Sequence, residues 1–298
     1  MAQNLPNYSQ YMLHQSIINP AAVGRYNDMG ASALYKYQWA GIKGAPRIAN
    51  IDFFMPLPND QYNSNSQAYV SAIITDERIG ARVSDQLTVS YAYRIELGEE
   101  GYLTFGLGGT LGMEKTRNEL IETTDPDDPI FIGNSPTLFT PNFRAGLYYH
   151  TPKYYAGFSI PNILTNTYKL TGTGYKGAIN YSALTSHYIL HGGMRFDISD
   201  NMAFTPSVLI KSVGGAPIQL DLNAHLIFGG KFGVGLSYRT EKILVAMINY
   251  KATQNILVGY SFNYDLTLLN KFTNGSHELI LTYTLDDERT NLGVGYVR

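Results

Sequence analysis

Short stretches of this chain alternate apolar and polar side chains with a period of two. The pattern is clearest near residue 260, where Ile256, Val258, Tyr260 and Phe262 are separated by Leu257, Gly259, Ser261 and Asn263. This period is typical of a β-strand whose two faces meet different surroundings. Fourteen such stretches occur in the 298 residues. They predict one sheet that closes on itself, because so long an open edge would aggregate.

The predicted strands have lengths near the ~9–11 residues that a membrane-spanning strand needs. They cover residues 28–37, 47–55, 67–76, 86–97, 102–113, 141–150, 153–160, 186–198, 202–212, 217–228, 231–239, 242–251, 254–264 and 276–285. The predicted fold class is therefore all-β: a closed antiparallel transmembrane β-barrel of about 14 strands, of the outer-membrane type.

The links between these strands support the same interpretation. Counted from the first strand, the even-numbered links are mostly tight, whereas the odd-numbered ones include the long segments 114–140, 161–185 and 265–275. Outer-membrane barrels have short periplasmic turns and longer outer loops. Exceptions are the short odd links after Ser212 and Arg239 and the long even link 56–66. Because fourteen is even, both chain ends are expected on the side of the short links.

Charged side chains fall on the polar face of the predicted strands. Val89 and Leu222 belong to the face expected to meet lipid, where a charge at mid-membrane costs ~2–4 kcal/mol. A set of ionisable residues is expected to line the lumen instead: Arg94, Glu96, Arg144, Arg195, Asp221 and His225. The favoured interpretation is a salt-bridged filling that closes the barrel. A ligand site or transport path is the alternative.

Composition agrees with a barrel that is apolar outside and polar inside. Hydrophobic residues make up 44% of the chain and charged residues 15%, yet the mean hydropathy is −0.14. No apolar run reaches the ~18 residues of a membrane helix. The 24 Tyr residues suit a membrane–water interface, where a ring with an apolar body and a polar tip is favoured. A Tyr-rich soluble β-sandwich is the alternative.

Composition also excludes several function classes. The chain has no Cys, which excludes disulfides, thiol catalysis and cysteine metal sites. The formal net charge of −2 provides no basic field for nucleic acid. His187 and His191 would lie about 13 Å apart on a strand, at ~3.3 Å per residue, too far to share a metal ion. The acidic segment 122–129 has oxygen ligands that suit Ca²⁺, but a solvated loop is favoured because the EF-hand spacing is absent.

No catalytic motif is present, so the protein is not expected to be an enzyme or to need a cofactor or metal. The sequence contains neither a Gly-x-Ser-x-Gly elbow nor a phosphate-binding loop. A membrane esterase with an outward Ser–His pair is left open as a minor alternative.

The expected organisation is a single barrel domain with a segment at each end. Residues 1–27 contain Tyr8, Tyr11 and Ile18 without strand alternation, and are expected to form a periplasmic segment or a plug. Residues 28–286 form the barrel and residues 287–298 a periplasmic tail. The chain opens without a basic and apolar leader, so it is interpreted as a mature chain from which a signal peptide has been removed.

Several motifs together resemble those of the PorP/SprF-like family of type IX secretion system membrane proteins. The N-terminal part carries Gln10 and Tyr11, then Asn19 and Pro20. The first odd-numbered link, residues 38–46 and here called the first long-side loop, contains the most specific block, with Gln38, Trp39, Gly41, Gly44 and Pro46. Further matches are Asp76–Gly80, Tyr91–Arg94, Tyr154–Asn162 and Ser276–Glu278, so the resemblance covers residues 10–285.

The resemblance implies a barrel in the bacterial outer membrane that takes part in protein secretion and gliding motility. Its implied job is non-enzymatic. It would dock or anchor a secreted surface adhesin through the adhesin's C-terminal region, and link to other type IX secretion components in the periplasm. The implied partners are therefore a secreted adhesin, other secretion components and outer-membrane lipid.

Two questions stay open at this point. The loop around Trp39 could shape a partner site at the barrel mouth, or serve only as an interfacial anchor or a buried loop plug. The barrel itself could instead be a channel or transporter for a small or hydrophobic solute, since fourteen strands also suit that role.

Overall fold

A computed structural model of the chain describes residues 5–26, 29–58, 66–121, 137–165, 167–170, 179–182 and 185–285. Within these residues the strands are β1 (Gly30–Tyr37), β2 (Arg47–Pro56), β3 (Ser66–Ile79), β4 (Arg82–Leu97), β5 (Gly101–Thr116), β6 (Leu138–His150), β7 (Tyr154–Ile160), β8 (Thr167–Leu170), β9 (Ile179–Ser182), β10 (His187–Met194), β11 (Phe196–Ser199), β12 (Met202–Val213), β13 (Gln219–Phe228), β14 (Phe232–Arg239), β15 (Ile243–Lys251), β16 (Ile256–Asp265) and β17 (Ser276–Thr284).

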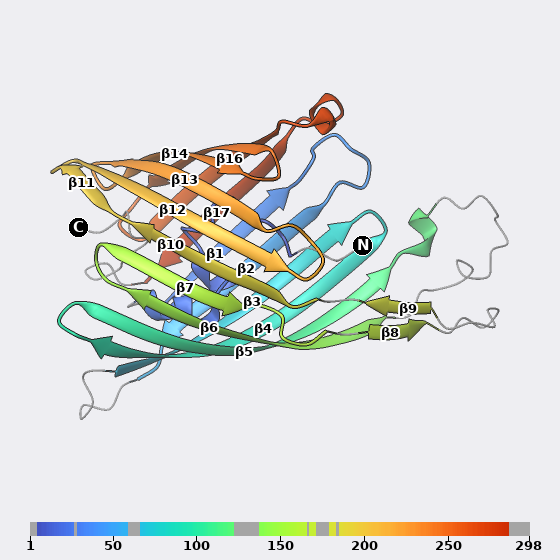
Figure 1. The fold of residues 1–298 in the computed structure, drawn as a ribbon, viewed down its shortest axis with the longest axis horizontal. Helices are drawn as coiled ribbons and strands as arrows, with labels where there is room; N and C mark the ends of the chain where they lie inside the picture. The colour runs from blue at the N-terminus through green and yellow to red at the C-terminus, as the bar shows by residue number, and fades with distance from the viewer. Residues whose placement is uncertain are drawn as a thin grey trace.

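The main sheet closes into a barrel (Figure 1). Each strand pairs antiparallel with its neighbours in the sheet, and the ring closes where β1 pairs with β17, with Gly30 opposite Thr284 and Tyr37 opposite His277. β10 pairs with both β7 and β12, so β10 and β11 together fill one strand position. The predicted closed antiparallel barrel of fourteen strands is therefore confirmed. In the described part of the chain, no helix is long and apolar enough to cross a bilayer.

The structure corrects three details of the predicted strands. β3 and β4 extend beyond the expected ends and meet at Gly80 and Ala81, because polar residues there continue the backbone ladder without an apolar face. The predicted strand 186–198 is interrupted at Arg195. The long link after β7 contains the separate hairpin β8–β9, which the alternation pattern did not indicate.

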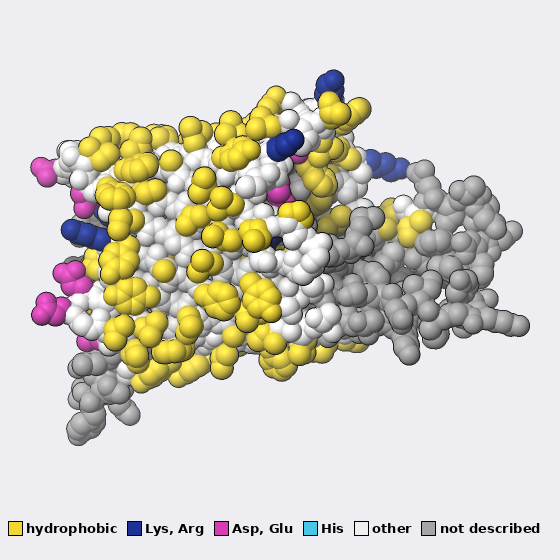
Figure 2. All heavy atoms as spheres, in the orientation of Figure 1, with side chains coloured by type: hydrophobic (Ala, Val, Ile, Leu, Met, Phe, Trp, Pro, Cys, Tyr) yellow, Lys and Arg dark blue, Asp and Glu magenta, His cyan; other side chains and the backbone are white. Residues whose placement is uncertain are grey.

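The two faces of the barrel wall differ as the alternation predicts. Val89 and Leu222 are 52% and 50% exposed on the outside, whereas the neighbouring Ser90 and Asn223 are only 1% and 6% exposed because they point inward. Apolar side chains cover the outer wall in a broad belt (Figure 2). In water such a belt would drive aggregation, but in a bilayer it is solvated by lipid tails.

The strand ends define two rims. One, here called the short-link rim, carries the tight connections β4–β5, β6–β7, β11–β12, β13–β14 and β15–β16. The opposite, long-link rim carries the extended connections β1–β2, β5–β6, β7–β10 and β16–β17. β1 begins and β17 ends at the short-link rim, as the even strand number requires. Leu5 instead lies at the long-link rim beside His187, because the segment before β1 crosses the lumen.

Candidate functional site

Residues 5–26 lie inside the barrel and are here called the plug. Its lower half is the part nearer the short-link rim and its upper half the part nearer the long-link rim. Two short 3₁₀-helices, η1 (Gln15–Ile17) and η2 (Pro20–Arg25), form the lower half. Asn19 caps η2 by accepting a hydrogen bond from the Ala21 amide at 2.9 Å, and Pro20 suits the first helical position because it has no amide hydrogen to satisfy. The lower half of the plug thus forms short helical turns and does not pair with the strands of the wall.

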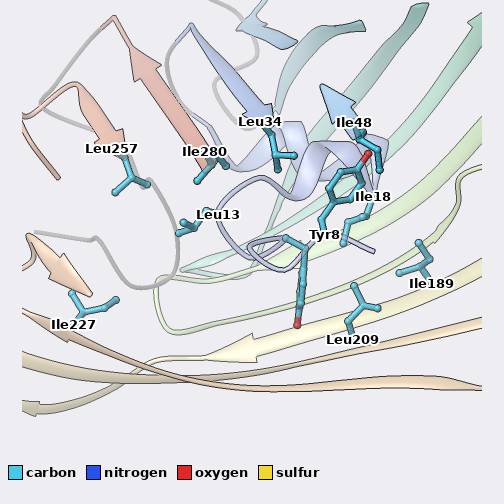
Figure 3. Close-up of a cluster of buried hydrophobic side chains, with 11 residues drawn as sticks. Tyr8, Leu13, Ile18, Leu34, Ile48, Ile189, Leu209, Ile227, Leu257 and Ile280 are labelled. Carbon is cyan, nitrogen blue, oxygen red and sulfur yellow. The ribbon is translucent and has the colours of Figure 1, made fainter. Parts of the chain in front are cut away.

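Apolar side chains fix the plug to the inner wall. Tyr8, Leu13 and Ile18 of the plug belong to one buried cluster with wall residues on β1, β2, β10, β12, β13, β16 and β17 (Figure 3). The wall residues of this cluster are Leu34, Ile48, Ile189, Leu209, Ile227, Leu257 and Ile280. Lower down, Tyr26 stacks on Phe54 with ring centroids 4.1 Å apart. The lumen therefore has an apolar core of its own, separate from the lipid-facing belt.

Glu278 near the start of β17 holds the upper part of the plug. Its carboxylate accepts hydrogen bonds from the backbone amides of Ser9, at 2.9 Å, and Gln10, at 2.8 Å. Its Oε2 lies 3.6 Å from Nζ of Lys36, which in turn donates to the Asn7 carbonyl. All these groups are buried or nearly so, where charge-assisted hydrogen bonds are strong and an unpaired charge is costly.

A second set of charged side chains, on β12, β13 and β14, holds the same stretch of the plug. Arg239 donates through Nε to Asp221 at 2.7 Å and through a terminal nitrogen to the Tyr8 carbonyl at 3.0 Å. Lys211 donates to the Leu5 carbonyl at 3.1 Å and also to the side chain of Asn7. The lumen charges therefore bind mainly the backbone of the plug, as well as one another.

The lower half of the plug is held by polar side chains on four strands. His14 lies 2.8 Å from Asp52 of β2, which also accepts from Ser16. Arg144 of β6 donates to the Ser16 and Ile17 carbonyls at 2.8 and 3.0 Å. These last carbonyls of η1 have no intrahelical partner, so a cationic donor satisfies them. Ser159 of β7 and Arg94 of β4 donate to the Ile18 and Gly24 carbonyls at 2.6 and 2.9 Å.

Glycines in the wall allow the plug backbone to approach closely. A Cβ on Gly106 would lie 2.3 Å from the Ala21 nitrogen, one on Gly146 2.1 Å from Asn19 Oδ1, and one on Gly259 2.2 Å from Gln10 Oε1. Each distance is far below van der Waals contact, so a larger residue would displace the plug backbone at Gly106 and the plug side chains at Gly146 and Gly259. These three wall glycines thus mark contacts with the plug and provide space for it.

The first long-side loop, residues 38–46, is fixed to its neighbours at the long-link rim. The Trp39 amide donates to Ser276 Oγ at 3.0 Å, and Ala40 exchanges backbone hydrogen bonds with the 274–275 turn. On the other side, the Gly80 amide donates to the Gly44 carbonyl at 2.8 Å. Gly41 and Gly44 have φ values of +96° and +74°, which glycine adopts without strain.

β17 connects the loop and the plug, since Ser276 holds Trp39 and Glu278, two residues on, holds Ser9 and Gln10. The N-terminal motif and the Trp39 loop motif, both singled out from the sequence, are thereby held by the same strand. Sequence reasoning missed Lys36, Asp52 and Arg239, which share the buried polar register. The Ser276–Glu278 motif was the available indication of the β17 contacts.

The predicted lumen residues divide into two groups. Arg94, Arg144 and Asp221 contact the plug or its charged partners, and His225 is buried on β13. Two other residues lie at the short-link rim. Glu96, one residue before the end of β4, is exposed. Arg195, between β10 and β11, pairs with Asp197 at 2.6 Å. Both lie close to the barrel end, and their expected place in the lumen lining stays a prediction.

Other candidate sites remain separate. His191 is buried, and its Nε2 lies 3.2 Å from the side-chain nitrogen Nδ2 of Asn19, while His187 lies beside Leu5. Within the described residues no group of three or more possible metal ligands is found, and the acidic segment 122–129 lies outside the described residues. A cavity of about 110 Å³ remains beside the plug on the β2–β7 side, lined among others by Tyr8, Ile73 and Arg144.

Comparison with known proteins places this geometry among outer-membrane barrels. The profile of a family described as type IX secretion system membrane protein PorP/SprF matches residues 1–283. None of the curated proteins matches the sequence. CymD, a monoaromatic hydrocarbon channel, is similar over 97% of this chain and 96% of its own, with 12% identity and a TM-score of 0.51.

A second solved structure gives the same result. The Acinetobacter baumannii outer membrane protein Omp33 is similar over 88% of this chain and 100% of its own length, with 12% identity and a TM-score of 0.50. At such low identity these similarities show the barrel fold alone.

Proposed function

Because the chain belongs to the PorP/SprF family of type IX secretion system membrane proteins and folds as an outer-membrane barrel, we propose that it is a non-enzymatic docking component of that apparatus. In this proposal the long-link rim holds a secreted surface adhesin by the adhesin's C-terminal region. The opposite rim links to other secretion components in the periplasm. Orientation follows from the short turns, which face the periplasm in outer-membrane barrels.

The filled lumen is the observation that carries the proposal. A transport barrel needs an open or readily opened path, whereas this lumen contains a plug held by an apolar cluster and by the buried charges of Glu278 on β17 and Arg239 on β14. Removing one partner of a buried ion pair is strongly destabilising, by about 3–5 kcal/mol, so the plug is expected to stay in place. A barrel closed in this way suits a rigid platform.

The loop around Trp39 supports the location of the docking site. Backbone hydrogen bonds on both sides hold it in one conformation, and a preordered loop loses little entropy when it binds a partner. Gln38, Trp39, Gly41, Gly44 and Pro46 are therefore the proposed partner-binding residues. Gln10, Tyr11, Asn19 and Pro20 have a supporting role because they lie in the plug.

The test uses cells that lack this protein and are complemented with variants. Trp39→Ala is expected to release adhesin from the surface while the barrel remains in the outer membrane. Leu120→Ala, an exposed apolar residue on another long link, is the matched control and should leave attachment unchanged. Surface adhesin is measured by antibody labelling of intact cells. Normal attachment in the complete absence of the protein would refute the proposal.

A solute channel is the rival function, favoured by the cavity of about 110 Å³ beside the plug and its mixture of apolar and polar lining. Planar-bilayer recording separates the two functions. A plugged docking barrel should be electrically silent, and steady single-channel conductance of the intact chain would favour the channel. The Ser159 side chain is buried and donates to the Ile18 carbonyl, so it is not available as an outward nucleophile.

A further inference from the structure

The link between β16 and β17 folds outward at the long-link rim. It contains the 3₁₀-helix η4 (Leu268–Lys271) and stands out from the outline of the barrel (Figure 1). We propose that this link, residues 266–273 and here called the η4 loop, inserts into the outer leaflet of the membrane. Its apolar side chains would lie among the lipid tails, and two lysines would bind the phosphates of the lipid headgroups. This inference needs only the outer-membrane placement of the barrel and does not depend on adhesin docking.

Hydrogen bonds place the η4 loop on the outside of the barrel wall. Tyr264 of β16 points outward, since it is exposed and its neighbour Asn263 is buried. The Tyr264 hydroxyl accepts a hydrogen bond from the side-chain amide of Asn270 at 2.5 Å. The Leu266 amide donates to the Lys242 carbonyl in the β14–β15 turn at 2.8 Å. A loop folded over the lumen would not contact the outward Tyr264 side chain, so the η4 loop lies on the lipid side of the wall.

The η4 loop exposes large apolar side chains. Leu268 and Phe272 are 74% and 72% exposed, the highest fractions among the large apolar residues that the structure describes, and Leu266 is also exposed. Apolar side chains at this corner of the molecule continue the outer belt (Figure 2). An apolar group in water is unfavourable in proportion to its exposed area, so insertion beside the lipid-facing belt removes this cost.

The η4 loop holds its shape by hydrogen bonds of its own. Thr267 caps η4 by accepting from the Leu269 amide at 3.3 Å, and Asp265 accepts from the amide and the hydroxyl of Thr267 at 2.8 and 2.6 Å. At the other end, Thr273 Oγ1 donates to the Ala40 carbonyl at 3.2 Å. The exposed apolar side chains are therefore carried by an ordered backbone, which loses little entropy when the loop enters the leaflet.

Two exposed lysines lie beside these apolar side chains. Lys271 is the last residue of η4, and Lys242 lies in the turn whose backbone binds the loop. The neighbouring carboxylates are engaged elsewhere, since Asp265 accepts hydrogen bonds within the loop and Glu241 accepts one from the side chain of Asn7 in the plug. A lysine at a membrane surface places its apolar stem along the lipid and its ammonium among anionic headgroups.

Lipid fits this surface better than a protein partner. The outward tyrosines Tyr260 and Tyr264 on β16 adjoin the loop, and the Tyr260 hydroxyl lies 2.7 Å from Nδ1 of His277. Tyrosines in this position are typical of the interfacial girdle of an outer-membrane barrel. The exposed apolar side chains of the η4 loop are thus continuous with the lipid-facing belt. Because the loop also contacts Ala40, insertion would fix the Trp39 loop close to the membrane surface.

Insertion can be measured with fluorescent labels, because the chain has no Cys of its own. Leu268→Cys and Phe272→Cys are each labelled with nitrobenzoxadiazole in the full chain and reconstituted into vesicles of phosphatidylcholine and phosphatidylglycerol. Lipids with a doxyl group on the acyl chain are expected to quench both labels strongly. Glu119→Cys is the matched control. It is an exposed charged position on the β5–β6 link of the same rim, and its label should stay in water and unquenched.

The combined change Lys242→Gln and Lys271→Gln tests the headgroup contact. It should reduce quenching of the label at position 268 by about twofold or more at low salt, whereas Lys231→Gln, on the short-link rim, should leave it unchanged. Heat-dependent gel migration confirms that each variant has folded. Labels at 268 and 272 that stay in water would overturn insertion and leave this surface to a protein partner. Equal quenching at position 119 would also overturn it, and unchanged quenching in the double Lys variant would overturn the headgroup contact.

Discussion

At the scale of single residues, buried charged side chains of the barrel wall hold the plug by hydrogen bonds to its backbone. Glu278 accepts two amide hydrogen bonds from the plug, Arg144 donates to two of its carbonyls, and Arg239 donates to a third. These contacts explain how a segment with little regular secondary structure remains in a polar lumen. They satisfy backbone groups that strand pairing would otherwise satisfy.

Glu278→Gln is expected to loosen the upper part of the plug. The change leaves Lys36 buried without its counter-ion and removes the charge that strengthens both amide bonds, at a cost of about 3–5 kcal/mol. Hydrogen exchange of the Ser9 and Gln10 amides should accelerate strongly. Glu99→Gln, an exposed change, is the control. Unchanged protection of both amides would show that the carboxylate charge contributes little.

Gly106→Ala and Gly109→Ala form a matched pair on one strand. A Cβ on Gly106 would meet the Ala21 backbone at 2.3 Å, whereas one on Gly109 meets nothing within 4 Å. Overpacking typically costs about 1–3 kcal/mol, so Gly106→Ala should lower the melting temperature and expose η2 to protease. Gly109→Ala should do neither. Equal behaviour of the two variants would argue against the close approach of the plug.

At the scale of elements, β17 connects the two parts of the candidate site. Ser276 fixes the Trp39 loop, and Glu278 fixes the plug, within the first three residues of that strand. β1 reinforces the link, because Lys36 on β1 faces Glu278 and the two are paired residues in the ladder. A partner that displaces the loop would therefore act next to the contacts that hold the plug.

Deleting residues 5–26 is expected to convert a silent barrel into a conducting one. The strands retain all their backbone pairs, while the lumen loses its apolar cluster and keeps a wall rich in charged side chains. Single-channel recording after reconstitution measures the effect, and heat-dependent gel migration confirms that the variant has folded. A folded but still silent barrel would mean that another segment closes the lumen.

At the scale of the whole molecule, the two faces of one sheet meet different surroundings. Lipid surrounds an outer belt of large apolar residues, and the inner face packs on the polar and apolar groups of the plug. The ring has no free edge, since β1 pairs with β17 and β10 with β12. Closure therefore satisfies the backbone hydrogen bonds of every spanning strand without a partner protein.

Leu222→Arg and Ile218→Arg test the depth of the belt. Leu222 lies in the middle of β13, and Ile218 lies just before its start at the long-link rim; both are exposed. Arginine at the bilayer midplane costs about 2–4 kcal/mol, but only about 0–1 kcal/mol near the interface. Denaturant titration of the barrel in lipid vesicles should show the larger loss for Leu222→Arg. Equal losses would contradict the membrane placement of β13.

The sequence by itself determined the strand alternation, the count of fourteen and the sorting of apolar side chains to the outside. These properties are local, because a period of two along one strand already assigns each residue to a face. The motif residues Asn19 and Trp39 could be recognised as special in the same way, but the contacts they make could not be assigned.

Only the tertiary structure decided where the plug lies and what holds it. Gln10 meets Glu278 and Gly259, and Asn19 meets His191 and Gly146; these pairs are far apart in the sequence. The plug has no periodicity to predict its path, and its position follows from the shape and charge of a lumen that exists only after the sheet closes.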